Sequence, residues 1–168
     1  SIITFLPLIG VCFILFNKGD EERVGKISFH VSLLTSLLVF VLSLFLWFNF
    51  DKTISSFQFV EEKKWIIDFV KYKLGVDGIS ILFVVLTAFI TPICIVATYN
   101  SVKFRKKDFF IALLVMETMM IGVFCSLDLF LFYLFFEAGL IPMFLIIGIW
   151  GWIIRVYAAC LLFPSYAC

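Results

Sequence analysis

The chain has 168 residues, of which 64% are hydrophobic, 19% aromatic and 15% charged, and its formal net charge is +1. Soluble domains contain roughly 25% charged and roughly 45–50% apolar residues, so this composition excludes a soluble globular protein and indicates an integral membrane protein. A nearly neutral chain without a dense run of Lys and Arg lacks the electrostatic footprint of nucleic-acid binding, so we expect no nucleic acid among its partners.

Five apolar stretches in the sequence are candidates for membrane spans. A hydrocarbon core of about 30 Å needs about 20 residues of helix. The stretches are 1–16, 28–50, 77–99, 109–127 and 129–151. We interpret the short first stretch as a clipped span and not a signal peptide, because no basic n-region or small-residue cleavage site accompanies it. The expected fold class is an all-α integral membrane protein with about five transmembrane helices.

Basic residues distinguish the two sides of the predicted bundle. The short loops 17–26 and 101–108 lie on one side if the five spans alternate, and the longer segment 51–76 lies on the other. Basic residues of the two short loops are Lys18, Arg23, Lys26, Lys103, Arg105, Lys106 and Lys107. The positive-inside rule places these loops in the cytoplasm or matrix, so we expect the N-terminus to face outward.

Segment 51–76 is expected to lie on the outer surface of the membrane. Within it Trp65, Phe69 and Tyr72 occur at i, i+4 and i+7, which predicts an amphipathic surface element. Trp and Tyr are typical of the membrane interface, so we interpret the segment as an interfacial anchor. Asp77 follows it and is expected to accept hydrogen bonds from the first free N–H groups of the third span.

Glu137 is the residue of the fifth span that points most strongly to chemistry. It lies eight residues into the span, about 12 Å below the surface, where an acid costs roughly 2.5–3.5 kcal/mol. Pro142 leaves the carbonyl of Ala138 without its helical donor, and Gly139 loosens the same turn, so water can bind there. These features predict a proton relay. The structural alternative is a carboxylate that pairs with another helix to fix packing.

Two further acids are candidates for the same path. Glu117 lies about eight residues into the fourth span, and the short turn at Asp128 makes the fourth and fifth spans antiparallel neighbours. Glu117 is therefore a possible second relay or a structural residue, and Asp128 is a cap or an entrance residue. The five cysteines lack CxxC spacing and His30 has no second ligand nearby, so no metal site is predicted.

Three motifs carry a resemblance to a known family. They are Leu74–Ser80, Met119–Phe124 followed by Leu127-Asp128, and above all Phe136–Gly151. Together they resemble chain 4, the M-type antiporter-like subunit of respiratory complex I, the proton-pumping NADH:quinone oxidoreductase. The resemblance implies the first part of a fourteen-helix antiporter-like fold in the membrane arm of that complex.

The resemblance also implies roles for residues and partners. Glu137 matches the family's glutamate on the fifth helix, which pairs with a lysine on a later helix and modulates its protonation. No cofactor is expected in this chain, because NADH, FMN, the Fe–S clusters and quinone belong to other subunits. The implied partners are the other membrane-arm subunits and the lipid bilayer. The implied location is the bacterial inner (plasma) membrane or the mitochondrial inner membrane, as a multi-pass protein.

Residues 152–168 depart from the family pattern, and we interpret them as a divergent tail of a truncated or frameshifted reading frame. The sequence holds no later helix with the partner lysine, so we expect this chain not to pump protons by itself. Two other functions fit the residues. One is a subunit of a multi-subunit cation/proton antiporter, which exchanges ions without redox coupling, and the other is a non-catalytic membrane scaffold in which Glu137 only pairs.

Overall fold

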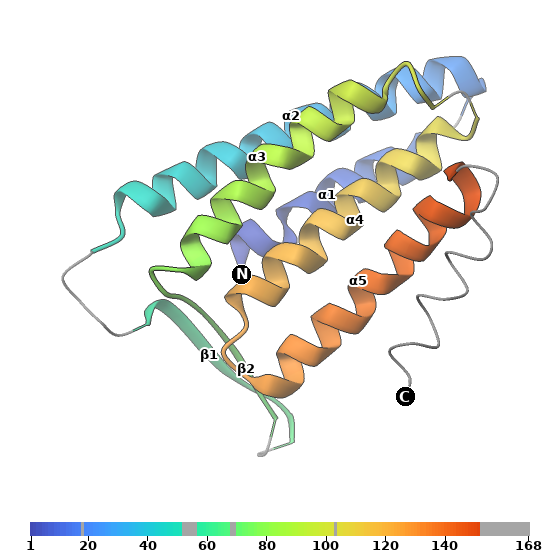
Figure 1. The fold of residues 1–168 in the computed structure, drawn as a ribbon. Coiled ribbons are helices and arrows are strands. Elements are labelled where there is room, and N and C mark those ends of the chain that lie inside the picture. The colour runs from blue at the N-terminus through green and yellow to red at the C-terminus, as the bar shows by residue number, and fades with distance from the viewer. Residues whose placement is uncertain (18, 52–56, 68–69, 103, 152–168) are drawn as a thin grey trace.

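Five helices and one β-hairpin make up the fold (Figure 1). The structure, a computed structural model, describes residues 1–17, 19–51, 57–67, 70–102 and 104–151. The helices are α1 (Ile2–Phe16), α2 (Glu21–Phe48), α3 (Ser80–Thr98), α4 (Lys106–Cys125) and α5 (Leu129–Trp150). The strands are β1 (Gln58–Ile67) and β2 (Val70–Val76). The tail predicted for 152–168 lies outside the described residues.

Four helices, α2 to α5, are long and apolar enough to cross a membrane, and α1 is a shorter apolar helix of 15 residues. The predicted helical membrane class is confirmed by this architecture. The second helix begins at Glu21, earlier than the predicted 28, because Glu21 and Glu22 occupy its first turn, where negative charge is favourable. With 28 residues, α2 extends beyond the hydrocarbon core by its polar first turns.

The helical spacing noted in segment 51–76 does not correspond to a helix, because the strands Gln58–Ile67 and Val70–Val76 pair antiparallel as a hairpin. Its register pairs Gln58 with Val76 and Glu61 with Leu74. Tyr72, Leu74 and Val76 pack in the main core, and Lys73, between Tyr72 and Leu74, forms an ion pair with Glu62. This alternation has the period of two that a strand requires. The i, i+4, i+7 spacing of the aromatic residues is therefore not the pattern that determines the backbone here.

The hairpin closes one end of the helix bundle, which we call the hairpin end. Leu74 and Val76 join the main core with residues of α2, α3, α4 and α5. The N–H of Leu127, in the turn between α4 and α5, donates to the carbonyl of Lys73 at 3.0 Å. A Cβ on Gly75 would come within 2.6 Å of Cδ1 of Leu127, so glycine lets this side chain approach the strand closely. The opposite end is the basic end, where Lys26, Arg105, Lys106 and Lys107 lie.

Asp77 caps the first turn of α3, as predicted. Its Oδ1 accepts hydrogen bonds from the N–H groups of Ile79 at 3.0 Å and Ser80 at 2.6 Å. The bond from the Ser80 N–H is the main reason why the pKa of Asp77 is lower than usual. The carboxylate therefore supplies acceptors that the first turn of α3 otherwise lacks.

We expect Asp77→Ala to lower the free energy of unfolding by about 1 kcal/mol, the usual cost of losing such a cap. The contribution is complete above the pKa of about 3.9 that Asp has in an unfolded chain, and it is lost as the pH falls through the lower folded pKa. Denaturant titration of the purified subunit in detergent at several pH values measures it. Asp20→Ala is the matched control, since Asp20 precedes α2 without a side-chain cap bond. An equal loss in both variants would contradict the prediction.

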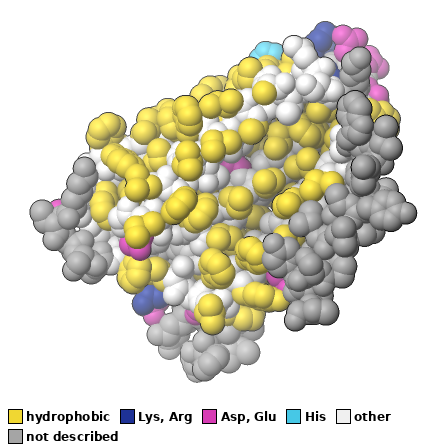
Figure 2. All heavy atoms as spheres, in the orientation of Figure 1, with side chains coloured by type: hydrophobic (Ala, Val, Ile, Leu, Met, Phe, Trp, Pro, Cys, Tyr) yellow, Lys and Arg dark blue, Asp and Glu magenta, His cyan; other side chains and the backbone are white. Residues whose placement is uncertain are grey.

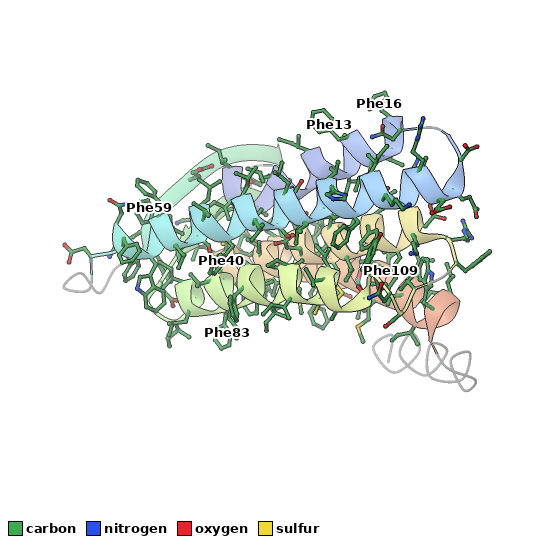
Figure 3. The ribbon with its side chains drawn as sticks, turned by 90° about the horizontal axis from the view of Figure 1, so that it is seen from above. Phe13, Phe16, Phe40, Phe59, Phe83 and Phe109 are labelled. Atoms are coloured by element: carbon green, nitrogen blue, oxygen red, sulfur yellow. The ribbon has the colours of Figure 1, made fainter. Side chains whose placement is uncertain are left out.

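The outer surface of the bundle suits a lipid environment. Figure 2 shows hydrophobic side chains spread over the broad face of the helices, with most charged groups near the ends. Phe13 and Phe16 project from α1 away from the bundle (Figure 3), and they are 62% and 86% exposed. Such exposure of large apolar side chains is unfavourable in water and ordinary in a bilayer.

Candidate functional site: two intramembrane carboxylates

Glu137 lies on the exposed face of α5, and Asp128 caps the start of that helix. The Asp128 carboxylate accepts a hydrogen bond from the Phe130 N–H at 2.8 Å. Two turns further along, the Tyr133 hydroxyl donates to Glu137 Oε1. Pro142 is buried within the continuous helix, five residues after Glu137. Tyr133 was not predicted from the sequence, although its i, i+4 spacing to the acid favours such a hydrogen bond.

Glu117 lies in the interior of the bundle instead. It is 2% exposed, and neither carboxylate oxygen has a hydrogen-bond partner among the described residues. The hydroxyl of the adjacent Thr118 donates to the Leu114 carbonyl of the same helix at 3.0 Å and not to Glu117. A buried polar group without a partner costs about 1–3 kcal/mol, and more when it carries charge. The fold therefore maintains Glu117 at an energetic cost.

The structure does not bring the two carboxylates together. Helices α4 and α5 meet where Gly122 lies against the Phe135 ring and where Met119 lies against Gly139. Glu117 is two residues from Met119, and Glu137 is two residues from Phe135, which turns each acid about 200° away from this interface. The acids therefore project from opposite sides of the helix pair. A path that joins them through the α4–α5 contact is not what the geometry provides.

The remaining titratable candidates of the sequence have local roles. His30 shares a hydrogen bond between its Nδ1 and the Lys26 carbonyl of the same helix, at 2.8 Å. Cys12, Cys94 and Cys125 are free thiols. Among the described residues no group of three or more His, Cys, Asp and Glu side chains is placed to hold a metal ion. Glu117 and Glu137 are the two acids that lie inside the spans among the described residues.

The fold and these carboxylates define a helical multi-span membrane protein with ionisable groups inside its spans, a class in which such groups mark proton or ion paths. Residues 3–124 match the family model described as NADH-ubiquinone oxidoreductase chain 4, amino terminus. Residues 126–167 match the model described as NADH:quinone oxidoreductase/Mrp antiporter, TM. The chain belongs to the family of NADH-ubiquinone oxidoreductase chain 4.

Two relatives agree with this family. NADH-quinone oxidoreductase subunit M of Rhodobacter capsulatus is 51% identical over 160 residues, which are 95% of this chain and 31% of that protein. NADH-ubiquinone oxidoreductase chain 4 of Marchantia polymorpha is 45% identical over 150 residues, or 89% of this chain and 30% of that protein. The chain therefore spans about a third of the length of these relatives.

A solved structure agrees as well. A chain of respiratory complex I from Thermus thermophilus with bound NADH superposes with a TM-score of 0.74 and 26% sequence identity. The superposition covers 94% of this chain and 30% of that chain. The helical bundle and its hairpin thus correspond to one part of a longer membrane subunit.

Proposed function

We propose that this chain forms the first part of a membrane-arm subunit of NADH:quinone oxidoreductase and contributes to proton translocation coupled to electron transfer from NADH to quinone. The supporting observation is Glu137, a carboxylate on an exposed face at mid-span of α5. An acid facing lipid is costly, so this face requires a covering partner. The relatives are about three times longer, and their further helices can supply that partner.

Glu137 acts in this proposal by ion pairing. A carboxylate next to a lysine on a later helix favours the charged lysine, and moving or neutralising the carboxylate releases the lysine's proton. The Tyr133 hydroxyl, which donates to Glu137, is a positioning residue that fixes the direction of the carboxylate. Glu117 is a second candidate relay, although the structure places it on the other side of the α4–α5 interface.

The setting of the subunit follows from the same family. NADH, FMN, the Fe–S clusters and quinone would bind to other subunits, and this chain would hold no cofactor. Its partners would be the neighbouring membrane-arm subunits and lipid. We place it in the bacterial inner membrane or the mitochondrial inner membrane, with the basic end toward the cytoplasm or matrix and the N-terminus outward.

A chimeric complex tests the proposed function. Residues 1–151 would replace the matching segment of subunit M in Rhodobacter capsulatus, the relative with 51% identity. Inside-out membrane vesicles would then be assayed for NADH-driven proton uptake and for NADH:ferricyanide activity, which reports assembled electron input. We expect both activities. A chimera that assembles and oxidises NADH without taking up protons would contradict the proposed role.

A cation/proton antiporter subunit is the second candidate, because the description of the second family match includes Mrp antiporters. The first match and the named relatives are all NADH oxidoreductase proteins, which favours complex I. The two functions differ in their source of energy. Proton uptake that requires NADH supports complex I, whereas exchange of Na⁺ for protons without NADH supports the antiporter.

A further inference from the structure

A stripe of small polar side chains runs along α2, and Thr35 within it lies against Gly10 of α1. Its members are all fully or nearly fully buried. They are Ser28, Ser32, Thr35, Ser36 and Ser43. Three of the hydroxyls bond to carbonyls of their own helix, as membrane serines and threonines ordinarily do: Thr35 to Val31, Ser36 to Leu33 and Ser43 to Phe40.

Ser28 and Ser32 are the exceptions. Both are 0% exposed, and neither Oγ has a hydrogen-bond partner within the described part of the chain. Glu117 is the only other described residue with buried side-chain oxygens in this condition. Each of these buried groups calls for an explanation, since buried polar groups are ordinarily bonded to protein or to ordered water.

The helix contacts place these three groups along one seam. Gly25 of α2 lies against Lys106 of α4, and one turn later the Phe29 ring lies 5.9 Å from the Phe110 ring. The two helices thus run parallel and in step. Seven residues beyond Phe110, Glu117 is level with Ser36. At about 1.5 Å per residue, Ser32 lies about 6 Å and Ser28 about 12 Å nearer the basic end than Glu117 does, measured along the helix axis.

The seam also reaches a polar opening. A cleft of about 840 Å³ at the basic end is lined by residues that include Val24, Lys26, Tyr99 and Lys106. Lys106 is the residue that contacts Gly25, three residues before Ser28. The unpartnered hydroxyls therefore continue from this cleft toward Glu117, whereas Ser43, with its hydroxyl satisfied, lies beyond the acid toward the hairpin end.

We propose that Ser28 and Ser32 line a hydrated seam between α1, α2 and α4, through which Glu117 takes up protons from the basic end of the bundle. The ligand of this site is water. Each water molecule would satisfy a serine hydroxyl and pass a proton toward the carboxylate, which has two free acceptor oxygens. The role as an uptake branch rests on the proposed proton translocation, while the hydration of the seam does not.

Thiol labelling tests the hydration. Ser28→Cys, Ser32→Cys and Ser43→Cys would be made in the chimeric complex, and inside-out vesicles, with the basic end outward, would be treated with 2-aminoethyl methanethiosulfonate. Mass spectrometry of the subunit then gives the labelled fraction at each position. We expect the first two to react at least about tenfold faster than Ser43→Cys, because a thiolate forms only where water reaches the sulfur. Equal rates at all three positions would overturn the proposal.

Proton uptake tests the role of the seam. We expect Glu117→Gln to slow NADH-driven proton uptake about tenfold at unchanged NADH:ferricyanide activity, since a positioned proton carrier is lost. Ser32→Ala should slow proton uptake severalfold, whereas Ser43→Ala should leave it unchanged. Both substitutions keep Glu117 itself intact. If the cysteines at positions 28 and 32 label fast but Glu117→Gln and Ser32→Ala both take up protons at the parent rate, the seam is hydrated and its role in proton uptake is overturned. Failure of the unaltered chimera to pump would instead contradict the proposed function, and labelling would still report on the seam.

Discussion

Replacing Glu137 by Gln in the chimeric complex is expected to lower NADH-driven proton uptake at least about tenfold, because the amide can neither pair with a lysine nor carry a proton. The NADH:ferricyanide activity should stay within about twofold of the parent, since in the proposed function the redox centres lie in other subunits. Glutamine keeps the shape of the side chain and can still accept the hydrogen bond that Tyr133 donates. The substitution therefore removes charge with little effect on packing.

Two companion variants make the result specific. Glu62→Gln is the matched control, because Glu62 is an exposed acid of the hairpin, away from the basic end, and its surface ion pair with Lys73 contributes little. Its proton uptake should equal that of the parent. Tyr133→Phe removes only the hydroxyl that positions Glu137, and we expect an intermediate loss of uptake. Full uptake by Glu137→Gln would leave Glu137 a structural residue and favour the scaffold function.

The second large effect is expected at the contact between α4 and α5. A Cβ on Gly122 would lie 2.6 to 2.8 Å from three atoms of the Phe135 ring. The ring is rigid and 5% exposed, so it cannot move aside without disturbing the core. We expect Gly122→Val to lower the free energy of unfolding by about 3 kcal/mol, at the upper end of the cost of overpacking.

Assembly provides the measurement for this prediction. Native gel electrophoresis of membranes should show little assembled complex for Gly122→Val, and denaturant titration in detergent gives the loss of stability. Gly148→Ala is the matched control in the next helix, because nothing lies within 4 Å of the Cβ that it adds. It should assemble fully. Normal assembly of Gly122→Val would mean that α5 can shift on α4 without cost.

The sequence predicted the helices well because each is a long apolar run bounded by polar turns. Asp77 and Asp128 were identifiable at helix starts for the same local reason. Segment 58–76 was not, since its aromatic spacing suggested a helix face while the alternation of Leu74 and Val76 toward the core determined a hairpin. That core exists only once α2, α3, α4 and α5 have assembled, so no local pattern revealed it.

The candidate site was predicted in its residues and not in its arrangement. Glu117 and Glu137 were found because acids are rare in apolar spans. Their opposite directions depend on which faces of α4 and α5 meet, and Gly122 decides this through its contact with Phe135. Ser28 and Ser32 were missed because serine is common in membrane helices, and only the absence of local bonds for these two sets them apart among the described residues.

The attachment of α5 at both ends limits how Glu137 can move. At one end the turn before α5 is bonded to the hairpin through Leu127 and Lys73. At the other end the Trp150 indole N–H donates to the Phe104 carbonyl at 2.8 Å. A helix held at both ends can displace its middle only by bending, and α5 bends most easily at Pro142. The carboxylate would therefore move by bending of α5 and not by translation of the helix along its axis. Bending leaves the hairpin and the basic end in place.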